Sequence, residues 1–125
     1  MELCFLIEYY MTDLDTREMK KATPLIIVEI IEYMPNSVVI KTIIKKTTGN
    51  ISAASFDMGE ALTEKIMPYD TFVQIIDGKA EIVIDGVSHL LDTGQSIIIP
   101  AHKPNIVKAN VRFKMISTII KSGYE

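Results

Sequence analysis

The sequence predicts a single all-β domain, a sandwich or barrel of short strands with a short helical segment near its start. From Val38 onward, short runs of β-branched and other apolar residues recur at near-regular spacing between turn residues. Two Asp-Gly pairs, Asp77-Gly78 and Asp85-Gly86, lie between such runs. Glycine tolerates the positive φ of a tight turn, so each pair indicates a hairpin. The chain has 125 residues, which is the size of one ordinary domain.

The helical segment is expected over residues 25–34. Thr23 is a candidate N-cap, and Pro24 suits the first helical position because its fixed φ is compatible with a helix. Several residues of this segment are β-branched, which weakens the helical prediction. The Pro35-Asn36-Ser37 sequence is typical of the turn that would end the helix.

The strands follow in order along the rest of the chain. Turn residues separate them, among them Gly49-Asn50, Met58-Gly59, Thr93-Gly94 and the run from Pro100 to Pro104. The predicted strands are Val38–Lys45, Ile51–Asp57, Phe72–Asp77, Ala80–Ile84, Val87–Leu91, Ser96–Ile99, Ile106–Ala109 and Phe113–Ile120.

The first 22 residues differ in composition from the rest and are expected to form a flexible or loosely docked extension of a barrel domain over 23–125. Residues 1–10 are apolar and residues 12–21 are highly charged. Met11 is an alternative start to Met1. The apolar segment carries two glutamates and lacks the basic leader of a signal peptide, and the single Cys4 fits a reducing compartment. We therefore expect a cytoplasmic protein.

Composition excludes several classes of function. The chain is 48% hydrophobic and 23% charged, as in ordinary globular proteins, and its longest apolar runs are too short to span a bilayer. A net charge of −3 does not favour a nucleic-acid partner. The sequence contains no phosphate-binding glycine loop and no serine or cysteine in the setting of an activated nucleophile.

Two stretches, Gly59 to Gly78 and Gly94 to Ala109, resemble the two motifs of the cupin family. Gly59, Gly78, Gly94 and Pro100 stand at the family's intervals. The resemblance extends over about two-thirds of the chain, from Val38 to about Lys121. It is to small, single-domain cupins of the cupin 2 conserved-barrel, RmlC-like type. It implies a double-stranded β-helix, that is, a jelly-roll barrel, and in the family three histidines and one glutamate inside this barrel bind a divalent metal.

The residues at those four ligand positions cannot form that metal site. The resemblance aligns the first two histidines with Lys65 and Met67, the glutamate with Thr71 and the last histidine with Asn105. Lysine is a cation, methionine is a soft ligand, and threonine and asparagine are weak neutral donors. We therefore expect a degenerate metal site, with no metal and no cofactor. Ala109 replaces the family's last asparagine, and His102 stands at the glycine position of the second motif.

Two interpretations of these positions remain open. In one, they form a ligand pocket, and a small anion would satisfy the buried polar groups. In the other, Lys65 pairs with an acid or reaches the barrel mouth, Met67 and Thr71 fill the core, and Asn105 is a hydrogen-bonded turn residue. The full set of pocket candidates is Lys65, Met67, Tyr69, Thr71, Gln74, His102 and Asn105.

Three functions from different classes follow. The first is a metal-free cupin that binds a small molecule or serves as a sensor or accessory protein. The second is an enzyme, either with relocated metal ligands or as a metal-independent isomerase or lyase that uses Lys65 and His102. The third is a structural or interaction dimer with a filled barrel. The strand over 113–120 has more apolar positions than one inner face needs, which favours a twofold homodimer.

Overall fold

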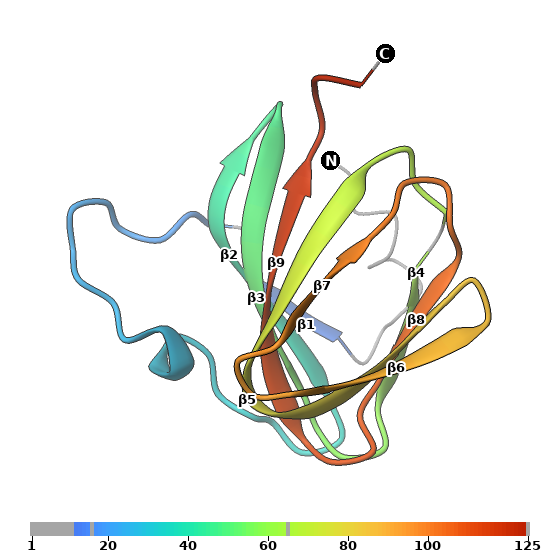
Figure 1. Cartoon of the computed structure of the whole chain (residues 1–125). Coiled ribbons are helices and arrows are strands. Elements are labelled where there is room, and N and C mark those ends of the chain that lie inside the picture. The colour runs from blue at the N-terminus through green and yellow to red at the C-terminus, as the bar shows by residue number, and fades with distance from the viewer. Residues whose placement is uncertain (1–11, 16, 65, 125) are drawn as a thin grey trace.

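The computed structural model describes residues 12–15, 17–64 and 66–124, and the all-β prediction is confirmed. Figure 1 shows the strands curled around a common interior. The elements are β1 (Thr12–Asp15), the 3₁₀ turn η1 (Ile27–Glu29), β2 (Val38–Lys46), β3 (Gly49–Phe56), β4 (Ala61–Glu64), β5 (Asp70–Ile84), β6 (Val87–Asp92), β7 (Ser96–Ile99), β8 (Asn105–Lys108) and β9 (Phe113–Ile120).

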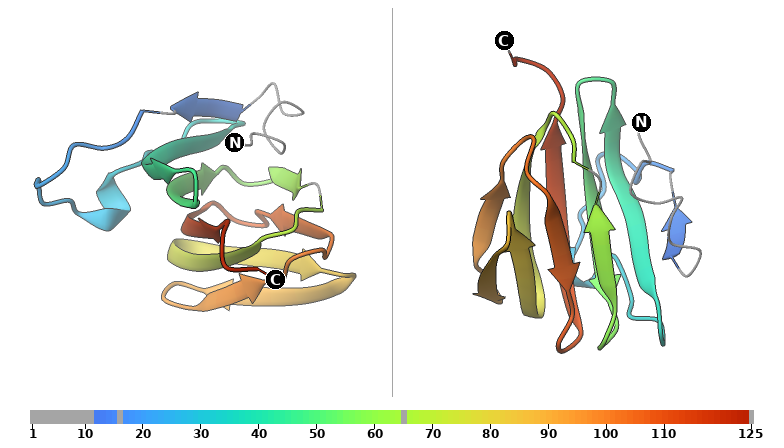
Figure 2. Two further views of the ribbon diagram at one scale, coloured as in Figure 1. Left: turned by 90° about the horizontal axis from the view of Figure 1, so that it is seen from above. Right: turned by 90° about the vertical axis from the view of Figure 1, so that its right-hand side faces the viewer.

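The strands form two sheets that share β5. Sheet A has the order β1-β2-β3-β9-β5-β7, and sheet B has the order β4-β8-β5-β6. The first half of β5 pairs with β7 and β9, and its second half pairs with β6 and β8. Apolar residues from both sheets meet in one continuous core between them. The two views in Figure 2 show this enclosed arrangement from above and from the side.

One of the two hairpin predictions is wrong. Asp85-Gly86 does form the turn between β5 and β6, and both residues have positive φ. Asp77-Gly78 instead lies inside β5, where the register with β9 shifts. Gly78 has φ +80°, and a Cβ on it would lie 2.3 Å from the carbonyl oxygen of Arg112. Glycine at this position therefore lets one long strand bend between two sheets and pack closely against β9.

The helix predicted over residues 25–34 is reduced to the single turn η1. Its N-cap is Ile26 and makes no side-chain cap hydrogen bond, whereas the Thr23 hydroxyl donates to the carbonyl of Lys21. Residues 17–37, which we call the strap, run outside sheet A and appear at the left of Figure 1. The strap buries Ile31 against the outer face of the sheet, so tertiary packing, not helix propensity, sets its conformation.

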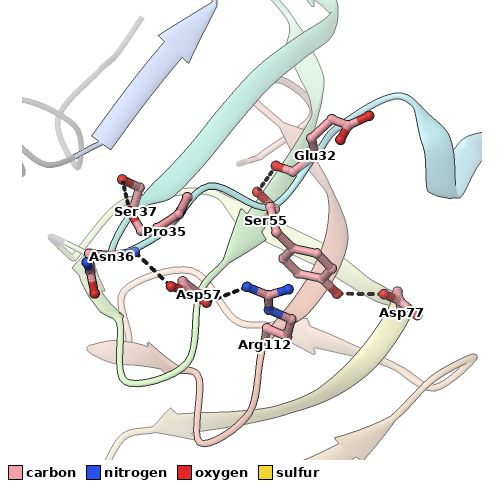
Figure 3. Close-up of polar contacts among 9 residues, drawn as sticks. Glu32, Pro35, Asn36, Ser37, Ser55, Asp57, Asp77 and Arg112 are labelled. Atoms are coloured by element: carbon pink, nitrogen blue, oxygen red, sulfur yellow. Dashed lines mark hydrogen bonds and ion pairs between the residues drawn. The ribbon is translucent and has the colours of Figure 1, made fainter.

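Polar contacts hold the strap to the sheet (Figure 3). The carboxylate of Asp57 accepts hydrogen bonds from the backbone N–H of Asn36 (2.7 Å) and from Arg112 (3.0 Å). These bonds lower the pKa of Asp57, the Asn36 bond most. The Tyr33 hydroxyl donates to Asp77 (2.6 Å), and burial together with this bond raises the pKa of Tyr33. The strap is thus an integral layer of the fold.

The prediction of a flexible extension concerns mainly residues 1–11 and 16, which lie outside the described residues. The boundary after residue 22 stays a prediction. Within the described ranges, no helix has the length and apolar character needed to cross a membrane.

Candidate functional site

The inner face of sheet A is wholly apolar at one end of the barrel, which we call the closed end. Phe56 and Phe113 pair across β3 and β9, and their rings stack with centroids 4.6 Å apart. Both side chains are fully buried, and Val38 pairs with Phe56 from the next strand. Aromatic stacking and the burial of two phenyl rings therefore stabilise this end of the core.

Hydroxyl groups replace apolar side chains farther along the same inner face. Thr42, Ser52 and Ser117 are cross-strand neighbours on β2, β3 and β9, and we call them the hydroxyl row. They lie on the same face as the buried Ala54 and Met115, because side chains alternate between faces along a strand. The barrel interior therefore has a polar band two residues along each strand from that buried pair.

A cavity lies at this polar band. Its volume is about 20 Å³, which is room for roughly one water molecule. Among the described residues its walls consist of apolar side chains, one thioether and three hydroxyl-bearing residues. None of these wall residues is charged. The wall residues are Ile40, Ser52, Ala54, Leu62, Thr71, Met115, Ser117 and Ile119.

Two connections lie at the end of the barrel beyond this cavity, which we call the mouth: residues 66–69, before β5, and residues 100–104, between β7 and β8. The backbone N–H of Ala101 donates to the Asp70 carboxylate (2.8 Å), and the backbone N–H of His102 donates to the carbonyl of Met67 (2.7 Å). These hydrogen bonds tie the two connections together.

The C-terminal tail adds a third segment at the mouth. The Tyr124 hydroxyl accepts a hydrogen bond from the backbone N–H of Asp70 (2.8 Å) and donates to the carbonyl of Ile120 (2.7 Å). Asp70 and Ile120 are themselves paired across β5 and β9, next to the pair of cavity residues Thr71 and Ile119. The Tyr124 hydroxyl thus bridges the last pair at the mouth.

Asn105 is the one buried side chain in the described part of the chain whose polar atom lacks a hydrogen-bond partner. It is 6% exposed, and its Oδ1 atom has no partner among the described residues. Asn105 lies on the same face of β8 as Val107, which pairs with the cavity residue Leu62. Leaving a buried acceptor unsatisfied costs about 1–3 kcal/mol. Such an atom is an expected contact point for a ligand or an ordered water.

Three of the seven pocket candidates occupy family ligand positions in the mouth half of the barrel. Thr71 lines the cavity, and Asn105 lies buried at the start of β8. Met67 is half-buried in the β4–β5 connection, where its carbonyl contacts His102. These three positions stand at the places where the cupin resemblance puts metal ligands.

The other four candidates are placed differently. Tyr69 is half-buried at the mouth, with its ring centroid 6.2 Å from that of Tyr124. Gln74 is exposed on the outer face of β5, because Val73 and Ile75 face the core. His102 is exposed and has φ +67°, a left-handed conformation that explains why the family has glycine at this position. Lys65 lies outside the described residues.

The three described residues at the family's ligand positions do not fit a divalent metal. Met67, Thr71 and Asn105 offer a thioether, a hydroxyl and an amide, which form no site for a hard or borderline divalent ion. Nor do the described residues bring three histidine, cysteine, aspartate or glutamate side chains together anywhere. The chemistry that this site supports is hydrogen bonding in a largely apolar enclosure.

Sequence reasoning missed the hydroxyl row. Ser52 and Ser117 lie within apolar runs, and their face is defined only once the strand register is known. The available signal was their alternation with Ala54 and Met115, which would have placed all four on one face.

Comparison with solved structures agrees with the fold. A conserved protein of unknown function from Streptococcus pyogenes matches with a TM-score of 0.80 and 24% identity, over 88% of this chain and 96% of that one. A cupin superfamily protein from Desulfitobacterium hafniense matches with a TM-score of 0.78 and 27% identity, over 86% and 98% of the two chains. The chain therefore has the cupin fold, as its motifs predicted.

A third similar structure is the cupin 2 conserved barrel domain protein from Leptotrichia buccalis. It matches with a TM-score of 0.72 and 29% identity, over 75% of this chain, and the match spans 46% of that protein. No family model matches the sequence, and no curated protein matches it. Fold alone does not determine activity, so the function must be argued from the site.

Proposed function

We propose that this chain is a metal-free cupin barrel that binds a small molecule by hydrogen bonds at its mouth half, as a binding, sensor or accessory protein. The observation that carries the proposal is the cavity whose wall includes the hydroxyl-bearing Ser52, Thr71 and Ser117. A barrel that served only as a structural scaffold would gain stability from apolar side chains at these positions.

The two alternative functions receive less support from the described residues. A hydroxyl acts as a nucleophile only beside a general base, and the described wall residues include hydroxyls but no such base. A structural protein with a barrel filled by apolar side chains agrees with the closed end. It does not explain the hydroxyl groups of the hydroxyl row. Among the candidates, Lys65 would supply a cation for a small anion at a family ligand position, and it lies outside the described residues.

The experiment is an NMR titration of the full ¹⁵N-labelled chain with methanol and with urea, two small uncharged probes. We expect saturable shifts of the amides of Ser52, Thr71 and Ser117. Ser117→Val should weaken the binding at least about fivefold by removing a hydroxyl from the wall. The neighbouring Thr118→Val is the matched control, because Thr118 lies on the outer face of β9. Saturable shifts confined to the outer surface would contradict the proposal.

We also propose that the chain forms a twofold homodimer through the outer face of sheet A. Part of the apolar surplus on β9 is used within the chain, because Ile116 packs against Ile31 of the strap. Next to it, a row across five neighbouring strands is apolar except for Thr118: Ile98, Phe72, Thr118, Ile51 and Ile44. Analytical ultracentrifugation should give a dimer that Phe72→Lys dissociates, whereas a monomeric wild type would contradict the proposal.

A further inference from the structure

We propose that the strap docks this protein on the surface of a bilayer that contains anionic lipids. The docking segment, which we call the strap tip, consists of three consecutive aliphatic residues, Leu25, Ile26 and Ile27. The inference goes beyond the proposed function, because the strap runs outside sheet A and the described wall of the barrel cavity contains none of these residues.

The strap tip exposes aliphatic side chains that do not pack on the sheet. Leu25, Ile26 and Ile27 are 44%, 62% and 45% exposed, whereas Ile31, four residues after the tip, is 3% exposed. In Figure 1 and in the left view of Figure 2, this part of the strap projects away from the barrel. One exposed aliphatic residue needs no explanation, but three in succession on a projecting segment indicate an interaction surface.

The chain is fixed to sheet A on both sides of the strap tip. After the tip, the carbonyl of Val28 accepts a hydrogen bond from the side chain of Lys114 on β9 (2.7 Å). Before the tip, the backbone N–H of Met19 donates to the carbonyl of Ile43 on β2 (3.1 Å). The fold therefore holds the aliphatic side chains in place, which reduces the entropy that the segment loses when it binds.

Four lysines, which we call the basic cluster, lie around Glu18 near the strap tip. The Glu18 carboxylate accepts a hydrogen bond from the backbone N–H of Lys45 (2.7 Å). It also forms ion pairs with Lys21 (3.4 Å) and Lys46 (3.6 Å), and Lys20 directly precedes Lys21. One carboxylate among four lysines leaves a net positive charge. Lys21 precedes the tip by four residues, so its Cα lies within about 14 Å of the Cα of the first tip residue.

Other acidic residues do not cancel this charge. Glu29 is the one acidic residue of the segment 20–29, which also contains two lysines. Asp13 and Asp15 belong to β1, which pairs with the first four residues of β2, whereas the two lysines of the basic cluster on β2 are its last two residues. The strap tip and the basic cluster thus form a positive region in a chain whose net charge is −3.

Aliphatic side chains beside lysines fit the surface of an anionic bilayer better than they fit a protein partner. Lysine is depleted in protein–protein interfaces, where aromatic residues and arginine are enriched. At a bilayer, aliphatic side chains enter the boundary between head groups and acyl chains, and lysines attract anionic head groups. Such docking needs only a few apolar residues, and not the long apolar run of a segment that spans the bilayer.

The test is co-sedimentation of the full chain with vesicles of phosphatidylcholine alone and of phosphatidylcholine with about one-third phosphatidylserine. We expect binding at least about tenfold tighter to the vesicles with phosphatidylserine, and weaker binding as the salt concentration rises. Ile26→Asp should weaken this binding at least about fivefold, and Leu25→Asp is a second variant of the tip. The double variant Lys20→Gln/Lys21→Gln should also weaken it at least about fivefold.

Two substitutions outside the strap are matched controls. Leu90→Asp changes an aliphatic residue of β6 that is 75% exposed, and Lys79→Gln changes a lysine of β5 whose side chain is 75% exposed. Both should leave vesicle binding unchanged. Thermal unfolding of every variant verifies that it folds.

Several results would overturn the inference. They are no binding to the vesicles with phosphatidylserine, equal binding to both compositions, or an equal loss of binding in Ile26→Asp and Leu90→Asp. If Ile26→Asp dissociated an oligomer but left vesicle binding intact, the strap tip would be a protein contact instead. None of these results bears on the barrel cavity, because Ser117→Val should weaken small-molecule binding and leave vesicle binding unchanged.

Discussion

The closed end and the mouth of the same barrel are built from the same strands but from different side chains. On β9, Phe113 stacks on Phe56 at the closed end, whereas Ser117 joins the hydroxyl row four residues later. The closed end has no space for a ligand in its stacked aromatic pair, and the mouth half holds a small cavity and an unsatisfied amide. Apolar packing is thus concentrated at one end of the barrel, and polar side chains at the other.

The largest expected difference comes from truncating one residue at each end of β9. Phe113→Ala should lower the free energy of unfolding by about 3–5 kcal/mol, because it removes a fully buried ring and leaves a cavity. Ser117→Ala should change it by less than about 1 kcal/mol. Urea unfolding of the two variants measures the contrast, and equal losses would show that the two ends do not differ as described.

The bend of β5 near the closed end gives the next largest effect. Gly78→Ala forces an L-residue to φ +80° and places a Cβ 2.3 Å from the carbonyl oxygen of Arg112, so we expect a loss of about 2–4 kcal/mol. Gly86→Ala has a similar φ of +83° but nothing within 4 Å of the added Cβ. It should cost about 1 kcal/mol, measured by thermal unfolding. The larger loss of stability at Gly78 measures the cost of the contact with Arg112. Equal losses in the two variants would contradict the role of that contact.

At the mouth, removing a polar group should stabilise the fold. Asn105→Val replaces an unsatisfied amide by an apolar side chain, so the free energy of unfolding should stay unchanged or rise by up to about 1 kcal/mol. The reverse change two residues away, Val107→Asn, should lower it by about 2–4 kcal/mol. Chemical denaturation compares the pair. A clear loss of stability in Asn105→Val would mean that the amide already serves the fold.

The smallest effect concerns pH and the strap, which is anchored beside Phe56 through Asp57. Because the folded state lowers the pKa of Asp57, this group contributes stability above its ordinary pKa of about 3.8, and the contribution is lost as the pH falls through the lowered value. Wild type should therefore lose more stability between pH 6 and about pH 3 than Asp57→Asn, which cannot titrate there. The measurement is urea unfolding of both proteins at both pH values. Equal losses of unfolding free energy in the two proteins would contradict the role given to Asp57.

Part of this contrast is readable from the sequence. The β-branched runs predict most strands, and Asp85-Gly86 predicts the β5–β6 hairpin correctly. The sequence also places Thr71 and Asn105 at ligand positions, and both turn out to face the interior. The spacing of the glycines was sufficient to align these positions with the family's motifs. Backbone geometry fixes the positions of these glycines, and the loss of metal ligands does not alter that geometry.

Other features depend on contacts between distant residues and could not be predicted. Gly78 is typical of a hairpin turn until Arg112 is known to pack against it. Residues 25–34 have a helical pattern, but the burial of Ile31 against the outer face of sheet A determines their conformation instead. The hydroxyl row requires the register of β2, β3 and β9, which no local pattern contains.

The most direct test of a barrel that binds without metal is the metal content of the purified, tag-free protein. The measurement is plasma mass spectrometry after exposure to first-row divalent metals and removal of the excess. We expect less than about a tenth of an equivalent of any metal, because Met67, Thr71 and Asn105 supply no suitable ligand set. About one equivalent, lost when His102 is changed to alanine, would contradict it and identify a metal site built from relocated ligands.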